Sequence, residues 1–320
     1  MAVLNMADQI TAIEAAKRVN NPDAFHIIEC LRMTNEMLAD LPAIQANDGT
    51  VHTTLRRLNQ PGGTHRIYNQ GVDIKASQTD TVRDRIAMLG AYSVVDKAMA
   101  DHTGNRAAFR QSEAVAILKG MGIDQAKDLV YGNNTADKAQ IDGLAVRLSK
   151  VDNKTVFSMG GSGNDLTSLY LIAAGADLCH LIYPKGSSSI GVTRSDQGEK
   201  IWEDQEKKRY QALVEYFEAQ YGITIRDPAA VIRICNIEAA VNGDDLIDAI
   251  LSCRRRLPPG ASTYALYANL DVLIKIDKTA RDRGNVVYTA ADPWGKEITH
   301  IRDIRCRQMD VILSTEEAVA

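Results

Sequence analysis

A cluster of glycines marks the one stretch of this sequence where backbone chemistry is conceivable. In TVFSMGGSGNDLTSLYLIAAG, residues 155–175, a β-branched run ends in a glycine turn, and an apolar stretch with helical spacing follows. A strand, a glycine turn and a helix can together bind phosphate through backbone N–H groups at the helix N-terminus. One hypothesis is therefore a phosphate- or nucleotide-binding enzyme that uses this loop, whose glycines are Gly160, Gly161 and Gly163.

The residues around these glycines argue against that chemistry. A Walker A loop needs Lys and Ser or Thr directly after its last glycine, whereas this chain has Asn164 and Asp165 there. A dinucleotide fingerprint needs a third glycine at the position of Leu166. A nucleophile elbow centred on Ser162 would need glycine in place of Asn164. The sequence favours a structural turn, with Asn164 or Asp165 capping a following helix.

Other reactive residues form no recognisable set. The five cysteines are scattered without a C-x-x-C pair, and the six histidines show no H-E-x-x-H spacing. We therefore expect no metal, no cofactor and no catalytic centre, and hence no enzyme.

Composition indicates a soluble protein of the cytoplasm that does not bind nucleic acid through a basic surface. The 320 residues carry a net charge of -4, which gives no basic surface for a phosphate backbone, and 45% of them are hydrophobic. No run approaches the roughly 20 apolar residues that span a bilayer, and the N-terminus lacks a secretory signal.

Four helices and several strands are predicted around the turn. Helical spacing predicts a helix over 25–41, ended by Pro42, and a long helix over 103–132 that ends at Gly132. A further helix is expected over 263–284. Extended structure is expected at 86–99, 144–148, 176–183, 209–227 and 229–240, and a capped helix at 242–260.

Residues 51–85 are predicted to form a hairpin that lacks a core of its own. Extended, Thr-rich runs flank a turn signal, and both faces carry polar or cationic side chains. An isolated hairpin is marginal in water, so this one is expected to project and to gain order from another molecule. Its candidate contact residues are Arg56, Arg57, Pro61, Gly62, Gly63 and Arg66.

Several stretches resemble the major capsid proteins of short-tailed bacteriophages. They are TGNRAAFRQSEAVAILKGM, GGSGNDLTSLYLIAAG followed by HLIYPKGS, YGITIRDPAAVIRICNIE and the ending CRQMDVILSTEEA. They follow the family's order and span most of the chain from about residue 27. The chain departs from the expected pattern at Pro228, where an aromatic residue is expected.

The resemblance implies a mixed α/β protein with the Hong-Kong-97-type capsid fold. The implied parts are an N-terminal arm, an extended loop that lies over a neighbour, a peripheral domain with a long spine helix, and an axial domain. We expect them at 1–47, 48–85, 86–150 (spine helix about 103–132) and 151–285, with a return to the peripheral domain at 286–320.

The implied function is structural. Copies of the chain would cluster as hexamers and pentamers in the icosahedral head, which encloses double-stranded DNA without sequence-specific binding. Made in the bacterial cytoplasm, the protein would reside in the virion, with a portal, a scaffold and a decoration protein as further partners and no membrane contact. The alternatives are the enzyme described above or another shell-forming protein such as an encapsulin.

Overall fold

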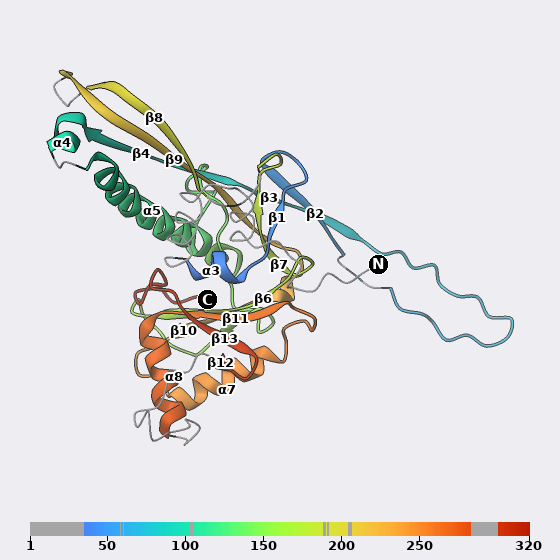
Figure 1. The fold of residues 1–320 in the computed structure, drawn as a ribbon. Helices are drawn as coiled ribbons and strands as arrows, with labels where there is room; N and C mark the ends of the chain where they lie inside the picture. The colour runs from blue at the N-terminus through green and yellow to red at the C-terminus, as the bar shows by residue number, and fades with distance from the viewer. Residues whose placement is uncertain are drawn as a thin grey trace.

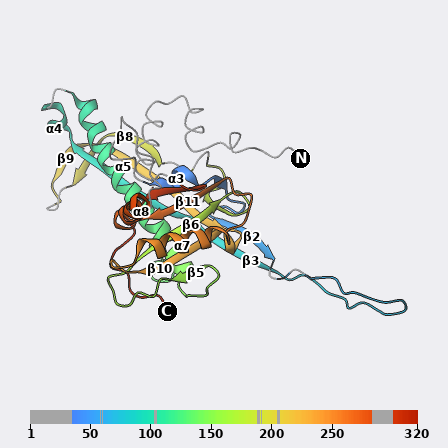
Figure 2. The same cartoon turned by 90° about the horizontal axis from the view of Figure 1, so that it is seen from below.

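The structure is a computed structural model of the chain and describes residues 35–57, 59, 61–102, 105–187, 190, 192–203, 207–282 and 300–320. These residues form an elongated arm, a lobe beneath it and a thin loop that projects away from both (Figure 1). Figure 2 shows the loop leaving the body on the side opposite to the arm. Most of the helix predicted over 25–41 lies outside the described residues. The described part contains the short helix α3, Glu36–Asp40. Asn35 has an extended backbone and its side chain caps the first turn, so a helix begins there and one unbroken helix over 25–41 is wrong.

The lobe is built on a mixed sheet in the strand order β5-β10-β6-β11-β13-β12. β10 and β11 flank β6 in antiparallel pairs, and β5 and β13 add parallel strands outside them. The strands are β5 Val156–Ser158, β6 Thr167–Ala174, β10 Val231–Ile237, β11 Thr263–Ala268, β12 His300–Ile301 and β13 Ile304–Gln308. Two helices, α7 (Gly243–Arg254) and α8 (Leu270–Asp282), lie against this sheet and bury their apolar sides in the core (Figure 1).

The segment after the glycine turn is a strand, so the predicted helix there is wrong. All eight residues of β6 are buried, because neighbouring strands lie on both edges and apolar layers cover both faces. A strand buried on both faces has a continuous apolar run with no alternation, and such a run cannot be told from a buried helix by periodicity. The turn therefore joins two strands, β5 and β6.

The arm consists of three long strands and the long helix. Its strands are β4 Ala87–Asp96, β8 Val192–Glu203 and β9 Arg209–Ile225. β9 pairs with β8 and with β4 in antiparallel ladders, while its last four residues pair with β7, Cys179–Tyr183, which β1, Ala43–Gln45, joins in parallel. One strand thus runs from the arm into the sheet of the lobe.

The predicted long helix is confirmed as α5, Arg106–Tyr131. Its buried positions recur every three or four residues, which gives one apolar side against the arm. They include Ala114, Leu118, Met121, Ala126 and Leu129. The helix continues through its two interior glycines and ends at Gly132, where a side chain would meet the carbonyl oxygen of Asp128 at 2.5 Å.

Three further expectations need correction. Residues 144–147, predicted as a strand, form the short helix α6, Leu144–Arg147. The helix predicted over 263–284 begins with strand β11 and becomes helical at Leu270. Strand β8 was missed because most of its residues are exposed, so its sequence lacks an apolar face and its pairing with β9 defines it. The strands predicted at 86–99, 176–183, 209–227 and 229–240 and the helix predicted at 242–260 are confirmed as β4, β7, β9, β10 and α7. The smaller elements are α4 Lys97–His102 and the 3-10 helix Pro228–Ala230.

Candidate functional site

The projecting hairpin has a regular base and an irregular outer part. Its base is the antiparallel pair β2, Val51–Arg57, and β3, Thr79–Arg85, with Val51 opposite Arg85 and Arg57 opposite Thr79. Beyond the base, residues 61–78 contain no strand and extend far from the body (Figures 1 and 2). We call residues 61–78 the projecting loop.

The turn of the hairpin lies at Ile67–Gln70, so the turn predicted at Pro61-Gly62-Gly63 is wrong. The strand register centres on Tyr68, and the N–H of Gln70 donates to the carbonyl oxygen of Ile67 at 3.2 Å. Asn69 takes a left-handed conformation with φ 64, which asparagine tolerates better than most residues. The two glycines instead lie on one limb of the loop.

The chain provides the projecting loop with few partners. Every residue from 61 to 78 is exposed. Cross-limb bonds are sparse: Gln78 donates its N–H to Asn59 Oδ1 at 2.7 Å, and Lys75 Nζ donates to the carbonyl oxygen of Gly62 at 3.3 Å. So little burial and so few bonds offset only a small part of the entropy of ordering the loop.

The candidate contact residues are spread along the hairpin and do not converge. Arg56 Nη2 lies 3.7 Å from Asp80 Oδ2 in a half-exposed ion pair, and Arg57 pairs with Thr79 in the ladder. The other four are fully open to solvent: Pro61, Gly62, Gly63 and Arg66.

The sequence interpretation missed four large apolar side chains near the turn. Ile67, Tyr68, Val72 and Ile74 are 75%, 98%, 50% and 101% exposed. Single exposed apolar residues are ordinary, but four within eight residues on one unsupported loop are characteristic of an interaction site. The signal was present in the sequence as an apolar cluster between polar, turn-forming residues, and it was outweighed by the flanking cations.

The base of the hairpin, in contrast, is bonded into the body. Arg147 Nη1 pairs with the buried Asp84 Oδ1 at 2.7 Å, and the same guanidinium donates to the carbonyl oxygens of Asp142 and Ile223. Asn47 brackets Thr53 by accepting its N–H at 2.8 Å and donating to its carbonyl oxygen at 2.7 Å. These bonds hold to the body the part of the ribbon around Thr53 and Asp84.

The backbone of the glycine turn is occupied by the chain's own groups. The N–H of Gly160 donates to Ser158 Oγ at 3.1 Å, that of Gly161 to the carbonyl oxygen of Asn236 at 3.1 Å, and that of Ser162 to Glu238 Oε1 at 2.9 Å. Gly160 and Gly163 have φ values of 86 and 111, which other residues rarely adopt. A phosphate would have to displace these bonds, one of them to a carboxylate.

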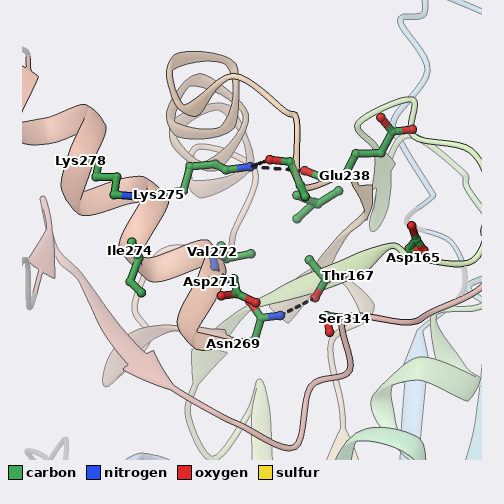
Figure 3. Close-up of a pocket in the computed structure, with 12 residues that line it drawn as sticks. Asp165, Thr167, Glu238, Asn269, Asp271, Val272, Ile274, Lys275, Lys278 and Ser314 are labelled. Atoms are coloured by element: carbon green, nitrogen blue, oxygen red, sulfur yellow. Dashed lines mark hydrogen bonds between the residues drawn. The ribbon is translucent and has the colours of Figure 1, made fainter.

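The pocket beside this turn is also unsuited to a phosphorylated substrate. It has a volume of about 460 Å³ and lies between α8 and the loops that precede β6 and follow β10 (Figure 3). Three carboxylates line it, from Asp165, Glu238 and Asp271. Lys275 Nζ donates to the carbonyl oxygens of Ala239 at 2.8 Å and Glu238 at 3.3 Å, so one of the two lining lysines is already bound.

Two negative findings concern the described residues. Within them, no group of three or more His, Cys, Asp or Glu side chains is arranged to hold a metal ion. None of the helices in the described ranges is long and apolar enough to cross a membrane.

Comparison with known proteins identifies the family. Residues 20–320 match the family described as major capsid protein GP7. Among solved structures, the chain is similar to a protein of bacteriophage Epsilon15, with a TM-score of 0.72 and 28% sequence identity over 89% of this chain and 90% of that one. It is also similar to a capsid chain of bacteriophage JBD30, with a TM-score of 0.49 and 10% identity over 87% of this chain and 91% of that one. Among curated proteins, none matched.

The family match and the similarity to the Epsilon15 protein confirm the predicted fold and function. The chain has the phage capsid fold of the Hong-Kong-97 type, and its copies form the icosahedral capsid of a phage virion. The family is structural and is not a class of enzymes, so the alternatives of a phosphate-binding enzyme and an encapsulin are not favoured. The chain belongs to the GP7 family of major capsid proteins.

Proposed function

We propose that the projecting loop joins neighbouring copies of this capsid protein in the shell. The observation that carries the proposal is the exposure of Ile67, Tyr68, Val72 and Ile74 on a loop with few partners in its own chain. Burial of these side chains against a second copy would remove a large apolar area from water. Each Å² of buried apolar surface contributes about 25 cal/mol of favourable free energy. Contacts with the neighbouring copy would then order the loop on assembly.

The cations of the hairpin complement this apolar contact. Arg66 and Lys75 lie next to the apolar residues in sequence and are exposed. Together with Arg56, Arg57 and the limb residues Pro61, Gly62 and Gly63, they are proposed to meet carboxylates and backbone groups of a neighbour. Such pairs at the rim of an interface mainly fix its register and orientation.

A surface of matching chemistry is present on the arm. The face of β4 that points away from α5 exposes Met88 at 60% and Tyr92 at 54%, and the Tyr92 ring lies 4.6 Å from the ring of Tyr216 on β9. Glu218 lies opposite Gly90 on the same face. We propose this face as the surface that receives the projecting loop of a second copy, with Glu218 available to a loop cation.

The expected domains receive amended boundaries. We propose that the spine helix α5 and β4 form the peripheral domain together with β8 and most of β9, which pair with β4. The axial domain then comprises the sheet of the lobe with α7 and α8, and β13 is one of its strands through its pairing with β11. Residues 309–320 return to the spine helix, since Tyr131 donates its hydroxyl hydrogen to Glu316 Oε1 at 2.5 Å and accepts the N–H of Leu313 at 2.9 Å. The N-terminal arm at 1–47 and the extended loop at 48–85 keep their expected limits.

The remaining roles follow from a structural function. We propose that the glycine turn, with Gly160, Gly161 and Gly163, only joins strands, that the chain has no catalytic activity, and that hexamers and pentamers are its assembly units. DNA is enclosed without sequence-specific contacts, consistent with the net charge of -4. A portal, a scaffold and a decoration protein are proposed as further partners.

The test replaces Ile67, Tyr68, Val72 and Ile74 together by serine and follows shell formation by negative-stain microscopy and size-exclusion chromatography. We expect the unassembled variant to unfold thermally like the parent, because these side chains are exposed and bury little area against the described residues. Closed shells should decrease at least tenfold. The matched control carries Thr64→Ser, Ala76→Ser and Ser77→Ala, which change exposed small residues of the same loop. Normal shells from the serine variant would contradict the proposal.

A further inference from the structure

Two histidines face each other where the hairpin base meets the body. His52 lies on β2 and His180 on β7, and their rings meet edge to face with centroids 5.6 Å apart. His180 is 2% exposed, whereas His52 is partly open to solvent. The contact therefore joins the projecting hairpin to the central strand system of the protein.

Several polar atoms around this pair are buried and have no hydrogen-bond partner among the described residues. They include both ring nitrogens of His180 and Nδ1 of His52. Thr224 Oγ1, opposite His180 in the ladder, and Asp84 Oδ2, opposite His52, are likewise buried without a partner. Unpaired buried polar atoms cost free energy, and a charge placed on a buried ring without a partner would cost more.

The charged groups that face the two rings come from four elements. Arg226, which follows β9, disfavours a proton on both rings. Asp84 on β3 favours a proton on His52, but its other carboxylate oxygen is bound by Arg147 of α6. Asp177 and the backbone of Gly175, both ahead of β7, favour a proton on His180, although Asp177 also pairs with Arg226 at 2.5 Å. Cys179 lies next in sequence, and burial raises the pKa of its thiol to about 12, which keeps it neutral.

We propose that His52 and His180 form a proton-operated latch that holds the hairpin base on the body while both rings are neutral and loosens it when either ring is protonated. The geometry supports this directly, because a charge on either ring would lie against the other imidazole within a buried cluster. This inference concerns the single chain and does not depend on the contact partner proposed for the loop.

The pH range follows from the titration of His180. Burial, the neighbouring His52 and Arg226 lower its pKa from the ordinary 6.5 to about 4, and burial also lowers the pKa of His52. A histidine with a lowered pKa stabilises the closed state fully above pH 6.5, and this contribution decreases as pH falls from 6.5 towards 4. With the ordinary pKa of 6.5 restored to His180 on opening, linkage for this residue increases the opening constant by about 30-fold between pH 7.5 and pH 5.

Hydrogen exchange of the unassembled protein tests the latch. After correction for the intrinsic effect of pH, protection of 51–57 and 79–85 should fall by about 30-fold from pH 7.5 to pH 5. Protection within α5 should stay unchanged and serves as the internal reference. An unchanged hairpin base, or an equal loss in α5 that signals general unfolding, would overturn the proposal.

Two variants and a control assign the effect to the pair. His180→Asn removes the titrating ring at the buried position and should abolish most of the pH dependence of the hairpin base. His52→Gln changes the more exposed partner, should fold even where the first variant fails, and should reduce the pH dependence. The control His65→Gln, in the exposed projecting loop, should leave the parental response intact. A parental pH response in His52→Gln would contradict the latch.

Discussion

The glycine turn at 160–163 and the glycine-bearing limb at 61–63 have similar compositions and opposite surroundings. Each N–H from Gly160 to Ser162 has a partner in the same chain, and a side chain added to Gly161 would meet the carbonyl oxygen of Asn236 at 2.5 Å. An added side chain at Gly62 or Gly63 would meet nothing within 4 Å. The turn at 160–163 is part of a packed body, whereas residues 61–63 belong to a loop with few contacts to the other described residues.

The same contrast separates the spine helix from the projecting loop. Apolar side chains of α5 such as Leu118, 1% exposed, lie inside the core, whereas those of the loop such as Tyr68, 98% exposed, lie in water. The first set stabilises the folded subunit, and under the proposed role of the loop the second set is left for contact with a neighbouring copy. Substitutions in the body should therefore change the stability of the subunit, and those in the loop should change assembly.

The largest expected effect is that of Leu118→Asp. It places an unpaired carboxylate in the core and removes the packing of a buried leucine, so the free energy of unfolding should fall by about 4 kcal/mol or more. Urea unfolding of the unassembled protein measures this change. The matched variant Tyr68→Asp should leave the subunit within about 0.5 kcal/mol of the parent and should still impair shell formation. A stable Leu118→Asp subunit would show that this side of α5 is not part of the core.

A smaller effect is expected from Gly161→Val. Its Cβ would lie 2.5 Å from a backbone oxygen and 2.8 Å from Leu166 Cδ2, so the strands on either side must move apart. We expect a loss of about 3 kcal/mol. Gly63→Val should change the free energy of unfolding by less than about 0.5 kcal/mol, because the space around it is open. Equal losses of unfolding free energy in both variants would remove the distinction between the glycine turn and the glycine-bearing limb.

The sequence predicts elements whose side chains alternate between core and solvent, and it also predicts the fully buried β10 through its β-branched residues. α5 was predicted to within a few residues because one side of it is buried and the other exposed, and α7 because Asn242 caps it and accepts the N–H of Asp244 at 3.2 Å. β6 and β8 were not, for opposite reasons: one is buried throughout and the other is largely exposed, so neither has a periodic pattern. β6 is a strand because it pairs with β10 and β11, and β8 because it pairs with β9. A local sequence pattern carries no information about such partners.

The candidate site was predictable only in part, because its details depend on contacts between residues far apart in the chain. The sequence indicates a hairpin without a core of its own, and the capsid resemblance supplies a role for it. The position of its turn depends on the register of β2 with β3, which is fixed by contacts such as Arg147 with Asp84, 63 residues apart in the chain. The His52 and His180 contact joins strands that are even further apart in sequence, and only the folded chain brings them together.

The smallest changes in unfolding free energy are expected from two substitutions on the β2–β3 ribbon. They show how far along the hairpin the contacts with the body extend. Two ion pairs lie on the same ribbon: Asp84 with Arg147 at 2.7 Å, where the carboxylate is 2% exposed, and Asp80 with Arg56 at 3.7 Å, where both side chains are at least one-third exposed. Asp84→Asn should destabilise the subunit by about 2 kcal/mol, because Arg147 loses its charged partner in a buried setting. Asp80→Asn should cost less than about 0.5 kcal/mol, since water already solvates that pair. Urea unfolding measures both, and hydrogen exchange should show the ribbon loosened only by Asp84→Asn. Equal effects of the two substitutions would mean that the body holds the hairpin along its whole paired length, and the boundary would then have to be moved outward to the end of β2.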